Sequence, residues 1–169
     1  ADATLLFRAK DLSAQALSWI QSHDKFKIEE VEVFATLTSK YKDASTVTKN
    51  LPVEVFCYED TDADPATQTS WIRTRDRSNL LRNVLTTVNP TVRLARFKPT
   101  ISLAASTSSQ NPSNIVPPKG TFIDALSTDQ WFSGLRLFAA CPVADATGQS
   151  YDFTVHISRR YKIVAKQPL

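Results

Sequence analysis

The chain has 169 residues, of which 42% are hydrophobic and 22% are charged, and its formal net charge is +3 at pH 7. These values are typical of one globular domain, which we place over residues 1–169, and they exclude a disordered chain. No stretch approaches the roughly 18 uncharged apolar residues that span a bilayer, so we expect no membrane partner. The first residues do not form a signal peptide, because their apolar run is short and is followed by charge.

The two cysteines, Cys57 and Cys141, each lie in an apolar stretch. Two cysteines are too few for a disulfide framework or a four-cysteine zinc site. We therefore expect two buried, reduced thiols and synthesis inside a cell, with one disulfide bridge as the alternative.

Alternation of apolar and polar residues predicts strands in the first third of the chain. It is clearest over residues 26–40, where a slip at Glu29-Glu30 changes the parity of the apolar positions. The expected elements are a strand over residues 4–10, a short helix or irregular cover over 11–22, a strand over 26–40, a polar loop over 40–50 and a strand over 51–58.

The middle of the chain is less regular and richer in proline. One or two helical turns are expected over residues 76–84, with Leu80, Leu81 and Val84 pointing inward. The other expected elements are a loop over residues 60–70, strands over 91–98 and 131–141, a brief strand over 101–104, an exposed loop over 106–119 and an ambiguous segment over 121–126.

Residues 151–166 form the longest predicted strand. Tyr151, Phe153, Val155 and Ile157 alternate with polar residues, as in a strand with one buried face. The alternation is interrupted at Arg159-Arg160 before Tyr161, Ile163 and Ala165 resume it. The interruption predicts a bulge near Arg159.

Six to eight strands with very little helix predict an all-β fold, an antiparallel eight-stranded jelly-roll sandwich. With only 3 glycines, tight hairpins should be rare, so long connections should cross between the two sheets. The predicted core contains Phe26, Ile28, Val31, Val33, Val55, Leu94, Leu135, Leu137, Phe153, Val155 and Ile157.

Charge is distributed unevenly along the chain. Residues 71–98 contain seven basic residues and one acidic residue, Asp76, whereas residues 52–66 contain five acidic residues and no basic ones. Such asymmetry indicates an anionic partner or complementary faces between identical subunits, and scattered solvated charge is the alternative.

Three basic clusters are the candidate nucleic-acid-binding residues: Arg8 and Lys10; Arg73, Arg75 and Arg77; and Arg159, Arg160 and Lys162. No base-reading module is recognisable, so binding should be to the phosphate backbone and independent of sequence. For the segment from Arg73 to Arg82, pairing with the acidic segment of a neighbouring subunit is an equal alternative.

Signatures of catalysis or of a cofactor are weak, and we expect neither. The only histidines are His23 and His156. Asp60, Asp62 and Asp64 are weak metal candidates, because alternate carboxylates bind hard cations. An EF-hand loop beginning at Asp60 would need Gly at its sixth position and Glu at its twelfth, where the chain has Pro65 and Trp71. A weak Ca²⁺ site between subunits remains the alternative to an ordinary acidic loop.

Four segments, in this order, resemble parts of known viral coat proteins. They are residues 23–33 (HDKFKIEEVEV), 92–99 (VRLARFKP), 129–138 (DQWFSGLRLF) and 151–169. The family is the single-jelly-roll capsid proteins of circular Rep-encoding single-stranded DNA viruses, which are circovirus-like; coat proteins of small positive-strand RNA viruses and satellite viruses share that fold.

The resemblance implies a coat protein whose identical copies form an icosahedral shell around a small nucleic-acid genome. It implies location in the virion and assembly inside the host cell, where the nucleus is one candidate compartment. The family has an arginine-rich N-terminal arm, but the first ten residues here hold only Arg8 and Lys10. Such an arm either precedes Ala1 or is absent, and in the second case packaging should be weaker.

Two other classes of function are alternatives. A non-viral β-sandwich binding module for a carbohydrate or a receptor would form a small oligomer and use an aromatic-lined pocket, for which Trp71 and Trp131 are candidates. As core residues, both tryptophans would fit the sequence better. A hydrolase would require His23 or His156 as its catalytic base.

Overall fold

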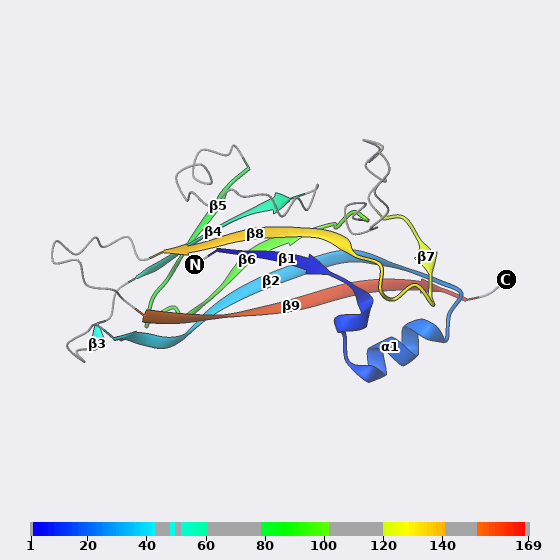
Figure 1. Cartoon of the computed structure of the whole chain (residues 1–169), viewed down its shortest axis with the longest axis horizontal. Coiled ribbons are helices and arrows are strands. Elements are labelled where there is room, and N and C mark those ends of the chain that lie inside the picture. The colour runs from blue at the N-terminus through cyan, green and yellow to red at the C-terminus, as the bar shows by residue number, and fades with distance from the viewer. Residues whose placement is uncertain are drawn as a thin grey trace, which may run out of the picture.

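The computed structural model describes residues 2–42, 48–49, 52–60, 79–101, 120–140 and 152–167. These ranges contain nine strands, one α-helix and one 3₁₀ turn, which runs from Ala9 to Asp11 (Figure 1). In chain order the other elements are β1 (Asp2–Phe7), α1 (Ala14–Gln21), β2 (Lys25–Lys42), β3 (Thr48–Lys49), β4 (Val53–Asp60), β5 (Leu81–Leu85), β6 (Thr91–Phe97), β7 (Ile123–Asp124), β8 (Phe132–Ala140) and β9 (Asp152–Lys166).

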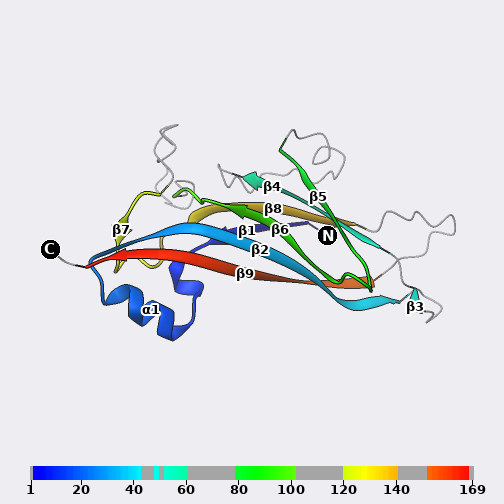
Figure 2. The same ribbon diagram turned by 180° about the vertical axis from the view of Figure 1, so that it is seen from behind.

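The strands form two antiparallel sheets that pack face to face. The β8 sheet has the order β1-β8-β4-β5. In the β2 sheet, β9 pairs with β2 along one edge, and β7, β6 and β3 pair with parts of its other edge. Figure 2 shows β2 between β6 and β9. The predicted all-β, jelly-roll-like sandwich is confirmed.

The chain passes repeatedly from one sheet to the other. It does so between β1 and β2, β3 and β4, β5 and β6, β7 and β8, and β8 and β9. This is the crossover pattern that the scarcity of glycine predicted. Because sequential strands are shared between the sheets, neither layer is a self-contained folding unit.

The inner faces of the sheets form one hydrophobic core. Its predicted members are buried in most cases: Phe26, Ile28, Val31, Val33, Val55, Leu94, Leu135 and Leu137. Phe153, Val155 and Ile157 are partly buried and pack against that core. Their lower burial follows from the position of β9, which is an edge strand of the β2 sheet.

The long β2–β9 pairing has three register shifts, each with its extra residue in β2, and the first of them is at Glu29. Ile28 pairs with Ile163 and Glu30 with Lys162, so Glu29 is the bulged residue and the predicted slip at Glu29-Glu30 is confirmed. The predicted bulge near Arg159 is wrong, because β9 pairs without a break from Ile157 to Lys162. Arg159 keeps the inward parity of its strand, which an edge position tolerates.

A second irregularity lies in β6. Val33 pairs with Ala95 and Phe34 with Arg93, so Leu94 is the extra residue and its side chain is buried. This bulge lets Arg93 and Arg96 point to the same outer face although they are three residues apart. Simple alternation along this segment would place Arg96 on the same face as Val92 and Leu94.

Two predictions for the connecting segments were wrong. Residues 81–85 form β5, which pairs with β4, and not a helical turn. Leu81 and Val84 are largely exposed while Leu85 is buried, because pairing with β4 overrides the local preference. The predicted loop over residues 40–50 is partly strand, since β2 extends to Lys42 and β3 occupies Thr48–Lys49. Residues 43–47, 50–51, 61–78, 102–119 and 141–151 lie outside the described residues.

The predicted short helix is confirmed as α1. Ser13 caps it, because its hydroxyl accepts a hydrogen bond from the Ala16 N–H at 3.3 Å. Ile20 is fully buried, and Leu12 and Leu17 pack against the core. The helix therefore covers the end of the sandwich where β2 begins (Figure 1). No helix in the described ranges is long and apolar enough to cross a membrane.

Cys57 is a buried free thiol on the inner face of β4, as predicted. Burial raises the pKa of Cys57 to about 11. Its S–H lies 3.5 Å from the carbonyl oxygen of Leu94 on β6, which supplies an acceptor. Cys141 lies outside the described residues.

Candidate nucleic-acid interface

The outer face of the β2 sheet carries three rows of charged side chains, which we call the charged face. On β2, Glu30 and Glu32 alternate with the buried Val31 and Val33, so they point outward. Directly opposite residues of paired strands share a face. The charged face therefore consists of Arg160 and Lys162 on β9, Glu29, Glu30 and Glu32 on β2, and Arg93 and Arg96 on β6.

The basic rows on the outer strands pair with the acidic row between them. Lys162 Nζ lies 2.8 Å from Glu29 Oε2, and Arg96 Nε lies 2.8 Å from Glu30 Oε2. Glu32 contacts one cation from each side, since Arg93 Nη1 is 3.2 Å from Oε1 and Arg160 Nη1 is 3.6 Å from Oε2. The pairs join β9 to β2 and β2 to β6 across their outer surface.

The cations on this face are far more exposed than the anions. The side chains of Arg93, Arg96, Lys162 and Arg160 are 54–75% exposed, whereas those of the three glutamates are 15–28% exposed. An arginine has five N–H donors and a lysine three, so one carboxylate does not use them all. The surface therefore presents positive groups with free hydrogen-bonding capacity above a recessed acidic row.

Mutual pairing keeps these groups ionised. The hydrogen bond from Lys162 lowers the pKa of Glu29, and the same bond raises the pKa of Lys162. Glu30 likewise raises the pKa of Arg96. These shifts favour the charged forms of Glu29, Lys162 and Arg96.

Arg159 is separate from its neighbours Arg160 and Lys162. It points toward the edge of the sandwich, where its Nη1 donates to the carbonyl oxygen of Leu6 at 3.4 Å and its guanidinium lies 5.6 Å from the ring centroid of Phe7. Burial raises the pKa of the neighbouring Tyr161, while a hydrogen bond with Arg159 opposes that shift. Arg159 thus links β9 to β1 of the other sheet.

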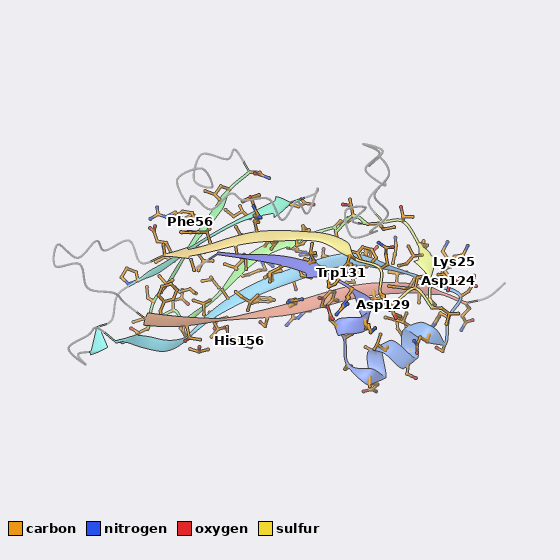
Figure 3. The ribbon with its side chains drawn as sticks, viewed as in Figure 1. Lys25, Phe56, Asp124, Asp129, Trp131 and His156 are labelled. Atoms are coloured by element: carbon orange, nitrogen blue, oxygen red, sulfur yellow. The ribbon has the colours of Figure 1, made fainter. Side chains whose placement is uncertain are left out.

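Arg8 and Lys10 also lie outside the charged face, in the segment that follows β1. Arg8 Nε is 2.8 Å from Asp11 Oδ1, and its guanidinium lies 4.3 Å from the Trp131 ring centroid. Lys10 Nζ is 2.9 Å from Asp129 Oδ1. Figure 3 shows Asp129 and Trp131 at the start of β8. The Trp131 ring already has a cation over it, which does not favour a sugar-binding platform there.

Several predicted site residues cannot be placed in this arrangement. Arg73, Arg75 and Arg77 lie outside the described residues, as do Trp71, Asp62, Asp64 and the side chain of Asp60. Within the described ranges, no group of three His, Cys, Asp or Glu side chains could hold a metal ion.

The histidines occupy different places. His156 is exposed on β9 opposite Thr36. The ring of His23 is tilted against that of Trp19 with centroids 4.7 Å apart, and its Nδ1 lies 2.8 Å from the Trp19 carbonyl oxygen, which makes that nitrogen the donor. Neither imidazole forms an ion pair with a carboxylate in the described part of the chain.

Sequence reasoning found two of the four exposed cations of the charged face, Arg160 and Lys162. It counted Arg93 and Arg96 in the basic 71–98 segment but did not assign them to a site. Their shared outward direction depends on the bulge at Leu94, which alternation alone does not reveal. The sequence did contain one signal for this face. Glutamates alternate with hydrophobic residues along β2, so they must point outward, where they can pair with cations of the neighbouring strands.

No protein-family model matches the chain, and no curated protein is significantly similar to it.

Proposed function

We propose that this chain is a structural coat subunit whose identical copies assemble into a closed icosahedral shell around a nucleic-acid genome. The charged face carries the proposal, because its three exposed arginines and its exposed lysine fit a phosphate backbone. The subunit would bind nucleic acid without reading its sequence and would perform no catalysis.

The energetics of the ion pairs support this role. Exposed ion pairs contribute roughly 0–1 kcal/mol each, so a cation can turn from its glutamate toward a phosphate at little cost. Each phosphate contact releases condensed counterions, which favours binding and makes it salt-dependent. The recessed glutamates hold the cations in rows without capping their outward side.

The fold supports the wall-forming part of the proposal. A two-sheet sandwich presents two broad faces and several strand edges, so one face can meet nucleic acid while edges and connections meet other subunits. A resemblance of four segments to circovirus-like capsid proteins points in the same direction. A single-stranded DNA genome is the form that this resemblance favours.

The test is light scattering and negative-stain imaging of the purified chain over a series of salt concentrations. We expect closed particles of uniform size whose assembly depends on salt and is promoted by added single-stranded DNA. A monodisperse monomer or trimer at every salt concentration, with and without DNA, would contradict the proposal and favour a small binding module.

A further inference from the structure

Three lysines gather on the outer side of the β2 sheet, at the end where β2 begins. Lys25 and Lys27 alternate with the buried Phe26 and Ile28, so both point outward. Lys25 is directly opposite Lys166 in the β2–β9 pairing, which places Lys166 on the same face. We call Lys25, Lys27 and Lys166 the lysine cluster.

An aromatic ring holds two of these lysines together. Lys166 Nζ lies 4.3 Å and Lys27 Nζ 5.0 Å from the ring centroid of Phe122. Phe122 precedes β7, which pairs with β2 at Lys25 and Phe26. Gly120, in the left-handed region with φ of 80°, forms the turn before it. Segments from three parts of the sequence therefore converge on the cluster.

Two members of the lysine cluster, Lys25 and Lys166, lack the carboxylate partners that the cations of the charged face have. Glu29 is 3.9 Å from Lys27 but is held by Lys162 at 2.8 Å. Asp124 pairs across the strands with Lys25, and Figure 3 shows the two side by side. Its Oδ1 instead accepts the Leu126 N–H at 2.8 Å. Among the described residues, Lys25 and Lys166 form no ion pair.

Lys25 and Lys166 carry like charges directly opposite one another, which is destabilising by itself. Asp124, which is opposite Lys25 on β7, and the two cation–π contacts with Phe122 oppose this repulsion. A bound anion would reverse the sign of the interaction. Local conflicts of this kind are expected where a binding site is built into a fold.

We propose that the lysine cluster binds a phosphate group of single-stranded nucleic acid, extending the basic row of β9. This inference rests on the proposed function for the choice of ligand. Lys162 lies about 13 Å further along the same face of β9, since a strand rises about 3.3 Å per residue. One strand of nucleic acid can therefore run from the lysine cluster to Lys162 and Arg160.

The test measures binding of a fluorescein-labelled oligothymidylate to the full chain by anisotropy over a range of salt concentrations. The variant K25Q/K166Q removes two charges from the cluster, and R82Q removes one from β5 of the other sheet, where Arg82 pairs with Glu54. We expect K25Q/K166Q to lower the slope of log affinity against log salt by about 1.4, the value for two single-strand phosphate contacts. An effect no larger, for each charge removed, than that of R82Q would overturn the proposal.

Two further readouts separate this role from other roles of the lysines. Without ligand, K25Q/K166Q should melt close to the wild type, because the loss of the Lys25–Lys166 repulsion and the loss of the Lys166–Phe122 cation–π contact oppose each other; a much lower melting temperature would show that the lysines are structural and would overturn the proposal. Inorganic phosphate at low millimolar concentration should compete weakly. Full displacement of the oligonucleotide by phosphate would identify a free-phosphate site and overturn the assignment to nucleic acid.

The outcomes also distinguish this inference from the proposed function. If the chain forms no shells but K25Q/K166Q still loses oligonucleotide affinity, the coat role fails and the lysine site stands. If shells form and enclose DNA equally well with K25Q/K166Q, and its salt slope is unchanged, the coat role stands and the lysine site fails.

Discussion

The two sheets of the sandwich differ in what their outer faces expose. On β2, outward residues are charged and partly solvated, whereas on β4 the outward Glu54, Phe56 and Tyr58 are all buried. Figure 3 shows Phe56 and His156 on opposite sides of the sandwich. Glu54 pairs with Arg82 of β5, so its burial is compensated. The outer face of β4 is thus buried, although Arg82 and Val84 beside it on β5 are exposed, whereas the outer face of β2 is solvated.

The sequences of β4 and β2 explain why their outer faces differ in burial. The β4 sequence VEVFCY is apolar at nearly every position, as expected for a strand covered on both sides. The β2 sequence alternates apolar residues with lysines and glutamates, as expected for a strand covered on one side. Stability should therefore depend on both faces of β4, whereas binding should depend on one face of β2.

The largest expected effect comes from truncating a matched pair of phenylalanines, one on each outer face. Phe56→Ala should lower the free energy of unfolding by about 3 kcal/mol, because a fully buried ring is lost. Phe34→Ala should cost about 1 kcal/mol, since Phe34 is only partly buried beside Arg160. Urea denaturation of both variants measures this; equal losses would remove the distinction between the two faces.

Charge variants on the charged face should change nucleic-acid binding in opposite directions. Arg160→Gln should weaken oligothymidylate binding and lower the salt slope by about 0.7, the value for one single-strand contact. Glu32→Gln replaces the carboxylate that pairs with Arg160 and Arg93 by a neutral amide of similar shape. Both arginines are then free to pair with phosphate, so the variant should bind a few-fold more strongly. If both variants weaken binding alike, the pairs are structural and the face does not contact phosphate.

The acid limb of the stability profile should depend on Glu29. Its pKa is lowered in the folded state, so its contribution is present above the ordinary value of 4.5 and is lost as pH falls through the lower folded value. The wild type should therefore lose stability below about pH 4.5 more steeply than Glu29→Gln. Thermal melts from pH 7 to pH 3 measure the difference, and parallel curves would show that the Glu29–Lys162 pair is unimportant.

The smallest expected effect is on the reactivity of Cys57, which lies in the core between the two sheets. With a pKa of about 11, Cys57 should have only about one thiol in a thousand ionised at pH 8. In a Cys141→Ser background, a thiol reagent should label native protein very slowly and denatured protein rapidly. Rapid labelling of the native protein would show that the inner face of β4 opens readily.

Sequence patterns predicted the strands better than their pairing. The alternation over β2 and β9 and the slip at Glu29 are local features, so they could be read directly from the chain. The β5 strand could not, because Leu81 to Leu85 becomes a strand only by pairing with β4. Arg159 was misread for a similar reason, since only its edge position beside Phe7 explains an arginine with inward parity.

The candidate site was accessible to sequence reasoning only in part. Arg160 and Lys162 could be predicted from the pattern of the closing strand. The lysine cluster could not, because it depends on the pairing of Lys25 with Lys166 and on the contacts of Phe122 with Lys27 and Lys166. These contacts join residues about 40 to 140 positions apart in the chain, distances over which composition and spacing carry no pairing information.

The most direct test of the coat role is nuclease protection. Particles assembled from the wild-type chain with single-stranded DNA should shield that DNA from added nuclease, and the combined variant R96Q/R160Q should assemble with less protected DNA. Fully digested DNA in a sample that contains intact particles would contradict genome enclosure. Equal protection by the variant and the wild type would contradict a role of the charged face in binding the DNA.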